Sequence, residues 1–238
     1  MPKVTLYQFQ LCPFCHKVRA ALELKKIPYE KVEVSPGNKK ELPDLPEEAP
    51  RKVPVIQIDD QILWDSTDIL MSIDRLLPNT LQLNAQHDET EKQKVVELED
   101  WMDEHLIPAL PTVIYATWAD AFRAARITAS ESKFSFWEAI KVKVFGSIIM
   151  RIIAKRILKR HNRTDGASWV EECLTYLEQE LADKEFLVGT KVSLADAAFH
   201  GALCCVEDFP VFQTAMKRPK VKTWFERIKL LRLEQKAT

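Results

Sequence analysis

The sequence has 238 residues, of which 46% are hydrophobic and 29% charged, and its formal net charge is −1. A charge this close to zero excludes a general electrostatic attraction to nucleic acid, so no nucleic-acid partner is expected. The five cysteines are an odd number without regular spacing, which argues against a disulfide framework and favours a reducing, cytoplasmic location. Because no run of about eighteen apolar residues occurs, the sequence predicts a soluble protein without a transmembrane helix.

The first predicted strand covers residues 4–9 and leads into the motif Cys-Pro-Phe-Cys at residues 12–15, which opens a helix over residues 13–25. A cysteine at the N-terminus of a helix faces unpaired backbone N–H groups and the positive end of the helix dipole, and both lower its pKa. Cys12 is therefore the predicted nucleophile. Cys15 lies one turn further on, where it can resolve a mixed disulfide formed on Cys12.

Three other roles for this motif compete with thiol chemistry. Two core cysteines would need no reactivity, but the position between a strand and a helix favours a redox pair. A structural zinc site needs four ligands, and Cys173, Cys204 and Cys205 are not spaced to supply them, so no metal site is predicted. With His16 the motif also matches covalent haem attachment, which belongs in exported proteins, whereas this chain starts without an apolar signal segment.

The next elements complete a small α/β domain. A strand is expected over residues 29–34, and the helix before it makes the two strands a parallel β-α-β pair. After a polar, proline-rich loop over residues 35–50, residues 53–58 and 62–64 predict a β-hairpin. A helix follows over residues 65–77. The resulting order, β-α-β-β-β-α, predicts a thioredoxin-like sheet flanked by helices.

Three short motifs of this domain resemble, in order and spacing, the glutathione-binding domain of the glutathione transferase superfamily. They are Cys-Pro-Phe-Cys at residues 12–15, Val53-Pro54 and Asp65-Ser66. The resemblance implies glutathione as the cofactor, a cis peptide at Val53-Pro54, a backbone contact from Val53 to the cysteinyl part of glutathione, and a γ-glutamyl end held by Asp65-Ser66. The full set of expected glutathione contacts is Phe14, Lys52, Val53, Pro54, Asp65 and Ser66.

Asp65 and Ser66 also have a purely structural interpretation, because both residue types are good helix N-caps. A capping role is sufficient to explain them. A ligand role adds that a helix N-terminus with a free hydroxyl and exposed N–H groups can hold a carboxylate. The sequence leaves both interpretations open.

The rest of the chain is predicted to be helical. Residues 78–90 are polar and unpatterned, and they separate a domain over residues 1–78 from an all-helical domain over residues 90–238. An aromatic stripe in the second domain consists of Tyr115, Trp118 and Phe122. Core packing is the simplest role for these side chains. In the superfamily this region faces the reactive sulfur, so the resemblance implies that they form the substrate wall, and it also implies a homodimer.

Residues 133–161 are the most unusual segment, because apolar residues at helical spacing alternate with lysines and arginines. A basic amphipathic helix of this kind can lie on an anionic membrane surface, so residues 141–160 are a candidate for peripheral membrane contact. The alternative is an ordinary helix of a bundle whose basic face is solvated.

Within the superfamily, the stretch 115–123 and the ending 155–161 resemble the membrane-associated prostaglandin E synthase type 2 family. That family isomerises a lipid endoperoxide and holds haem together with glutathione, so haem is a further ligand that the resemblance implies. Its members have a tyrosine three residues before the first motif cysteine, where this chain has Phe9. The missing hydroxyl argues against the isomerisation.

Together these patterns predict a glutathione-dependent transferase or thiol–disulfide oxidoreductase with a glutaredoxin-like motif on a glutathione transferase fold. The Cys12 thiolate is expected to attack a disulfide, a glutathionylated thiol or an electrophilic carbon, because a cysteine in this place forms a mixed disulfide with glutathione. Two alternatives remain. One is an isomerase of a lipid endoperoxide, and the other is a non-catalytic protein that binds glutathione, haem or a partner.

Overall fold

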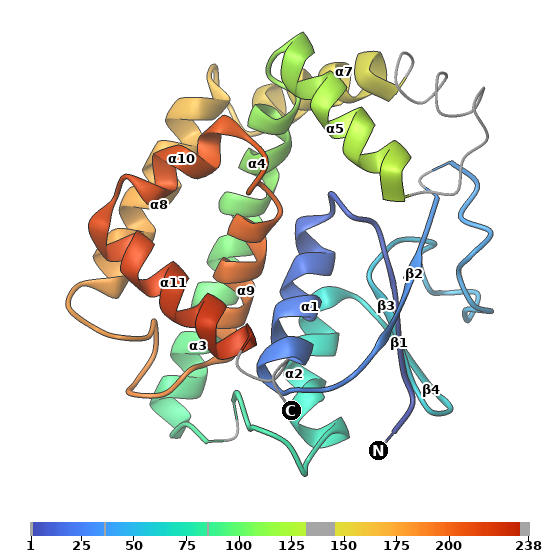
Figure 1. The fold of residues 1–238 in the computed structure, drawn as a ribbon, viewed down its shortest axis with the longest axis vertical. Coiled ribbons are helices and arrows are strands. Elements are labelled where there is room, and N and C mark those ends of the chain that lie inside the picture. The colour runs from blue at the N-terminus through green and yellow to red at the C-terminus, as the bar shows by residue number, and fades with distance from the viewer. Residues whose placement is uncertain (1, 36, 85, 132–145, 234–238) are drawn as a thin grey trace.

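The computed structural model describes residues 2–35, 37–84, 86–131 and 146–233. Its N-terminal part contains a four-stranded sheet in the order β2-β1-β3-β4 (Figure 1). β1 (Val4–Gln8) pairs in parallel with β2 (Glu30–Glu33) and antiparallel with β3 (Val55–Ile58), which pairs antiparallel with β4 (Gln61–Trp64). The predicted parallel β-α-β unit and the predicted hairpin are therefore both present.

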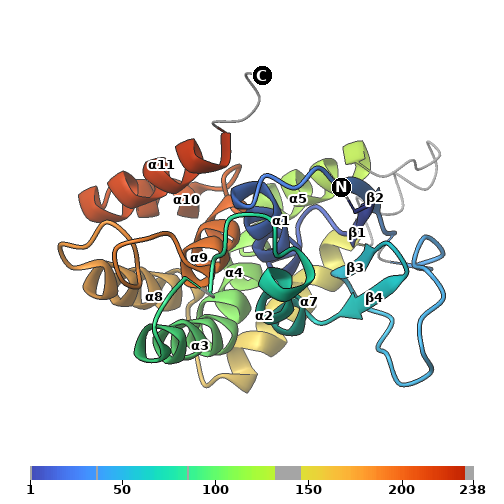
Figure 2. The ribbon, with the colours of Figure 1, turned by 90° about the horizontal axis from the view of Figure 1, so that it is seen from below.

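Two helices cover one face of this sheet. α1 (Pro13–Leu24) begins with a proline at its first position, where a backbone N–H would have no helical partner. α2 (Ser66–Leu76) turns its apolar side to the same core, which alternate strand residues such as Leu6 and Ile56 fill from the sheet. In Figure 2 both helices lie between the sheet and the C-terminal helices, so α1 belongs to the cores of both parts of the molecule.

The opposite face of the sheet has a smaller core of its own. Val34, Leu42 and Val55 are buried together there, and Leu45 packs against them from the loop that follows β2. This proline-rich loop therefore covers the second face of the sheet. The burial explains why a segment that is mostly polar still contains regularly placed leucines.

The C-terminal part is all-helical, as predicted, with α9 at its centre. All residues of α9 except the last are buried, and the helix packs along α1. A Cβ on Gly201 would lie 2.4 Å from the carbonyl oxygen of His16, so only glycine lets the two helices approach this closely. The bounds of the helices are α3 Glu89–Glu104, α4 Leu106–Ile114, α5 Trp118–Glu131, α7 Ser147–Arg160, α8 Gly166–Leu181, α9 Leu194–Cys204, α10 Pro210–Met216 and α11 Pro219–Leu233.

The start of α9 is fixed by a capping box. The Ser193 hydroxyl caps the Asp196 N–H, and the Asp196 carboxylate in turn accepts from the backbone N–H of Ser193 at 2.9 Å. The same carboxylate accepts from the Trp224 indole N–H at 2.8 Å and from the Leu187 N–H at 2.9 Å. This buried carboxylate joins α9 to α11 and to the preceding loop, and its role is structural.

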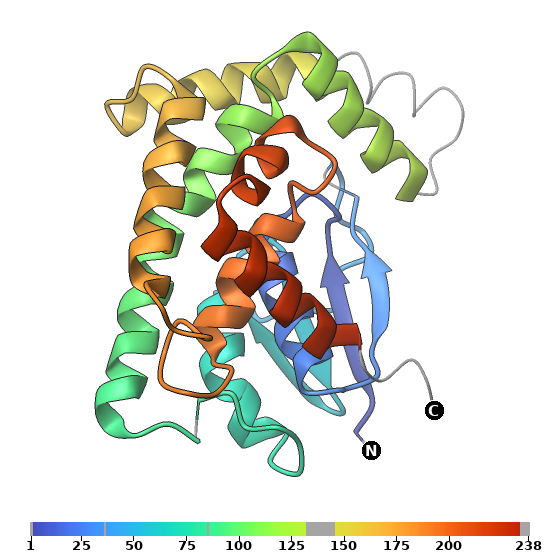
Figure 3. The same cartoon turned by 60° about the vertical axis from the view of Figure 1, so that its left-hand side comes forward.

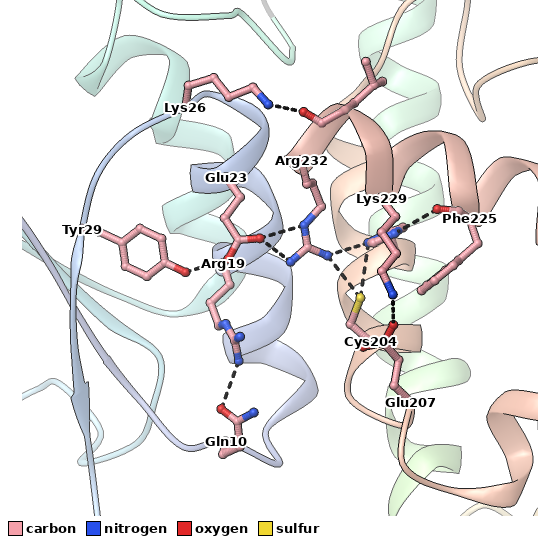
Figure 4. Close-up of polar contacts among 12 residues, drawn as sticks. Gln10, Arg19, Glu23, Lys26, Tyr29, Cys204, Glu207, Phe225, Lys229 and Arg232 are labelled. Atoms are coloured by element: carbon pink, nitrogen blue, oxygen red, sulfur yellow. Dashed lines mark hydrogen bonds and ion pairs between the residues drawn. The ribbon is translucent and has the colours of Figure 1, made fainter. Parts of the chain in front are cut away.

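A second polar cluster joins the end of α11 to α1 (Figure 4). Arg232 donates from Nε and Nη2 to the Glu23 carboxylate at 2.9 and 2.5 Å, and its Nη1 lies 2.7 Å from His200 Nδ1 and 3.1 Å from Cys204 Sγ. The Lys26 ammonium donates to the Leu231 carbonyl beside it. Burial raises the pKa of Cys204 to about 11, so Cys204 is a protonated structural thiol in this joint.

The break between α3 and α4 does not lie at the prolines of this region. Prolines ordinarily interrupt a helix, but the break here lies at His105, and α4 continues through both Pro108 and Pro111. Pro108 is in the first turn, where the N–H has no intrahelical partner, and the buried face of α4 offsets the bond lost at Pro111.

α5 and α7 form one end of the molecule (Figures 1 and 3). α7 covers most of the predicted basic segment, whereas residues 141–145 of that segment lie outside the described residues. In the part of the chain that the structure describes, no helix has the length and apolar character needed to cross a membrane.

Candidate active site

Cys12 is the N-cap of α1, with φ −99° and ψ 111°, so its side chain lies at the end of the helix where the backbone N–H groups are unpaired. Its Sγ is 3.9 Å from the carbonyl oxygen of Val53. The pKa of the Cys12 thiol is lowered, chiefly by a hydrogen bond from Cys15, with further contributions from the N–H groups of Cys15 and Phe14 and from the Lys17 charge. Burial opposes these effects without cancelling them.

Cys15 has the opposite character although it belongs to the same motif. Its side chain is fully buried, and burial together with the hydrogen bond to Cys12 raises its pKa well above that of an ordinary thiol. The hydrogen bond from the Cys15 thiol to the Cys12 sulfur therefore favours ionisation of Cys12 over ionisation of Cys15. Opposite shifts of this kind suit a pair in which one cysteine is a nucleophile and the other a resolving thiol.

His16 follows the motif directly, and its imidazole has a structural role. Its Nε2 lies 2.8 Å from the Gln10 carbonyl, and burial lowers its pKa to about 3. His16 is therefore neutral at physiological pH and holds the loop between β1 and α1 in place. It sets the position of the motif without acting as a base.

The peptide between Val53 and Pro54 is cis and lies immediately before β3. Within the described part of the chain, the Val53 N–H has no hydrogen-bond partner, although its carbonyl faces the Cys12 sulfur. An unpaired backbone N–H beside the Cys12 sulfur can pair with an extended peptide ligand. Lys52, a further residue of the predicted glutathione site, is exposed. Among the described residues only its backbone N–H is bonded, to the Pro50 carbonyl at 2.7 Å.

At the start of α2, the Asp65 side chain caps the helix, and the Ser66 hydroxyl is the group that could contact a ligand. Asp65 adopts a left-handed backbone with φ 75°, and its carboxylate accepts from the N–H groups of Thr67 at 2.9 Å and Asp68 at 3.4 Å. These two donors are therefore already used. The hydroxyl of Ser66 has no partner among the described residues and lies at the helix N-terminus, where it could receive a carboxylate.

The structure shows a buried ion cluster beside the motif that the sequence did not predict. The Lys17 ammonium is fully buried, pairs with Glu99, lies 2.7 Å from Asp103 Oδ1 and stands 5.6 Å from the centre of the Phe14 ring. The Thr67 hydroxyl donates to Glu99 at 3.0 Å, which joins the cluster to α2. Burial raises the pKa of Asp103 to about 6, with Lys17 opposing.

The acidic half of this cluster could have been found from the sequence. Glu99 and Asp103 are spaced i,i+4 on the same side of α3 as the buried residues Val95 and Met102. Acidic residues on a buried helix face need a cation from another element. Nothing in the sequence identifies Lys17 as that cation, because it lies 82 residues earlier.

The three aromatic residues predicted to form a substrate wall lie in different surroundings. Tyr115 is buried at the end of α4, and burial together with the nearby Cys205 and Cys12 raises the pKa of its phenol. Trp118 and Phe122 lie on α5 and are about half exposed, with ring centroids 6.3 Å apart. The structure thus brings Tyr115 into the electrostatic environment of the motif and leaves Trp118 and Phe122 on the surface.

Comparison with known proteins gives matches over both parts of the chain. The glutathione S-transferase N-terminal domain matches residues 6–80, and the glutathione S-transferase C-terminal domain matches residues 165–229. Prostaglandin E synthase 2 of Danio rerio is 26% identical to this chain, with 99% of this chain and 71% of that protein covered. The Mus musculus protein of the same name is 28% identical, with 95% and 69% covered.

Solved structures share the fold. The crystal structure of glutathione transferase F7 from Populus trichocarpa has a TM-score of 0.64 and 19% identity, with 95% of this chain and 93% of that chain covered. The four-stranded sheet, its flanking helices and the helical C-terminal part agree with these matches. The chain therefore belongs to the glutathione transferase superfamily.

Proposed function

We propose that this protein catalyses glutathione-dependent thiol–disulfide exchange through Cys12. In the first half-reaction the Cys12 thiolate attacks the glutathione sulfur of a mixed disulfide. The substrate S–S bond breaks, a Cys12–glutathione disulfide forms, and the substrate leaves as a thiolate that takes a proton from water. In the second half-reaction a glutathione thiolate attacks the glutathione sulfur of this adduct, so that glutathione disulfide leaves and the Cys12 thiolate is restored.

The observation that carries the proposal is the environment of Cys12. A thiolate is the nucleophile in such exchange, and Cys12 has the helix N-terminus, the Cys15 hydrogen bond and the Lys17 charge to stabilise it. Cys15 remains protonated and buried one turn away. It is placed to attack Cys12 Sγ in an adduct, which would release glutathione and leave a Cys12–Cys15 disulfide that needs reduction by two thiols.

Membership of the superfamily implies glutathione binding. We propose in addition which residues contact each part of the tripeptide. The cysteinyl amide would pair with Val53 beside the Cys12 sulfur, because the Val53 N–H has no partner among the described residues. The γ-glutamyl carboxylate would take the N–H and hydroxyl of Ser66 at the start of α2, with Asp65 holding that end of the helix. Phe14 and Lys52 would flank the tripeptide.

A second candidate is isomerisation of a lipid endoperoxide, which the similarity to proteins named prostaglandin E synthase 2 favours. Position 9 is the argument against it, since Phe9 offers no hydroxyl beside the motif and contacts it through its backbone, whose carbonyl accepts from the Cys12 N–H at 3.0 Å. Haem binding, a homodimer and a cytoplasmic location stay predictions.

The test is turnover of a glutathionylated peptide with glutathione as the reductant. Cys12→Ser should lower kcat/KM by at least about a hundredfold, because a serine hydroxyl is not ionised at neutral pH. Cys15→Ser should retain turnover if the monothiol route operates. Cys173→Ser is the matched control, since Cys173 is a buried thiol on α8. Full activity in Cys12→Ser would exclude the proposed mechanism.

A further inference from the structure

An apolar surface at one end of the molecule is formed by α5 and α7. Trp118 and Phe122 on α5 are 51% and 49% exposed, and Ile149 and Ile152 on α7 are 55% and 47% exposed. Ile148 on α7 is exposed as well, so five of the eight exposed large hydrophobic side chains in the described chain lie on these two helices. Such a concentration marks a binding surface, whereas single exposed apolar residues need no explanation.

This end surface is held together by contacts between the two helices. The Arg151 guanidinium lies 4.7 Å from the centre of the Trp118 ring and donates to the Ala116 carbonyl at 2.6 Å. Ser147 donates to the Ala121 carbonyl at 3.2 Å one turn earlier on α7. The exposed isoleucines and aromatic rings are therefore presented by packed helices in a fixed arrangement.

The second half of α7 adds charge of one sign to this surface. The helix carries five basic residues and no acidic residue in its sequence. Four of the five are exposed, and none of these four pairs with a described carboxylate, although ion pairs are frequent elsewhere in the described chain. The four are Lys155, Arg156, Lys159 and Arg160. The whole chain has a net charge of only −1, so this is a local concentration of positive charge.

Apolar side chains next to unpaired basic ones suit an anionic lipid surface. The rings and isoleucines can enter the boundary between headgroups and acyl chains, while the lysines and arginines meet anionic headgroups. A second copy of this chain is a poorer partner. A two-fold contact through the same surface would oppose it to an identical basic helix, and Asp120, the acid on this part of α5, is already paired with Arg123 at 2.9 Å.

We infer that the α5–α7 surface docks this protein on anionic membranes. The contact would be peripheral, because the described helices include none that could span a bilayer. It also sets an orientation. The N-terminal end of α1, where Cys12 lies, points toward the end of the molecule formed by α5 and α7 (Figure 1). The reactive thiol would therefore lie on the membrane side of the docked protein. This inference does not depend on the proposed thiol chemistry.

Flotation with lipid vesicles tests the inference on the full chain. Vesicles of phosphatidylcholine mixed with phosphatidylglycerol should bind the protein, with binding that weakens as salt is raised, and vesicles of phosphatidylcholine alone should bind it far less. Replacing Lys155 and Lys159 together by Gln should weaken binding roughly 30-fold, the effect expected for two basic residues at an anionic surface. Lys220→Gln with Lys222→Gln on α11 should leave it unchanged.

The apolar side chains of the α5–α7 surface are tested in the same way, with a matched control on α11. Ile149→Gln with Ile152→Gln should weaken binding at least about tenfold. Leu230→Gln with Leu233→Gln alters side chains that are 60% and 50% exposed on α11 and should have no effect. Each variant is used only with an unchanged thermal unfolding curve.

Three results would overturn the inference. They are no binding to anionic vesicles, equal loss in the α11 controls, or a dimer in sedimentation that Ile149→Gln with Ile152→Gln dissociates while vesicle binding persists. The last result would assign the surface to a second copy of this chain.

Discussion

The pKa values of two cysteines one helical turn apart are shifted in opposite directions in this protein, and their positions on the backbone explain the difference. Cys12 is the N-cap, where its sulfur meets unpaired N–H groups, whereas Cys15 is enclosed by the core. The thiol of Cys15 donates to Cys12, so the same contact lowers one pKa and raises the other. Lys17 adds a positive charge whose own burial is compensated by Glu99 and Asp103.

This arrangement predicts the pH dependence of Cys12 alkylation by iodoacetamide. The thiolate is the reacting form, so the rate should rise with pH and level off above a midpoint lower than the ordinary pKa of a cysteine thiol. Cys15→Ala should move the midpoint upward, because the largest stabilising contact of the thiolate is removed. Peptide mapping identifies the labelled residue. A midpoint that Cys15→Ala leaves unchanged would show that the hydrogen bond is not the cause.

At the level of elements, the pairing of α1 with α9 holds the helix that Cys12 caps against the helical part of the chain. Gly201 permits the close approach, since an added Cβ would also lie 2.7 Å from the Lys17 backbone nitrogen. Arg232 secures the far end of α1 through Glu23. The helix that carries Cys12 is thus fixed from both ends by residues of the C-terminal part.

Gly201→Ala tests this packing. Alanine is intrinsically better than glycine inside a helix by roughly 0.5–1 kcal/mol, so the substitution would stabilise an uncrowded α9. We expect the reverse, a loss of about 1–3 kcal/mol, because the new methyl group meets backbone atoms of α1 that cannot turn aside. Urea unfolding measures the change. Gly37→Ala, whose Cβ would come no closer than 4.0 Å to Ser35 Oγ, should be nearly neutral. A stabilised Gly201→Ala variant would contradict the packing argument.

At the scale of the whole molecule, local patterns predict the strands and helices of the sheet domain well. The Cys-Pro-Phe-Cys turn, the Asp59–Asp60 turn and the Asp65 cap each act within a few residues, so their consequences are visible in the sequence. The Lys17–Glu99 pair is not, because its partners come together only when α1 docks on α3. The break at His105 likewise depends on packing around α4, which outweighs the proline signal.

The aromatic stripe is a second feature whose arrangement could not be predicted from local sequence patterns. Tyr115, Trp118 and Phe122 suggest one face of one helix, but Tyr115 ends α4 and the other two belong to α5. Periodicity alone cannot reveal that turn. It also cannot show which of the three side chains is buried and which two form part of the exposed α5–α7 surface.

The proposed exchange of disulfides between Cys12 and glutathione can be tested by mass spectrometry. Cys15→Ser protein, in which an adduct cannot be resolved internally, is incubated with glutathione disulfide, digested and mapped. We expect one glutathionyl group, carried by Cys12, and none on Cys204, whose pKa is raised to about 11 by burial. An unmodified Cys12, with the protein still folded, would contradict the account.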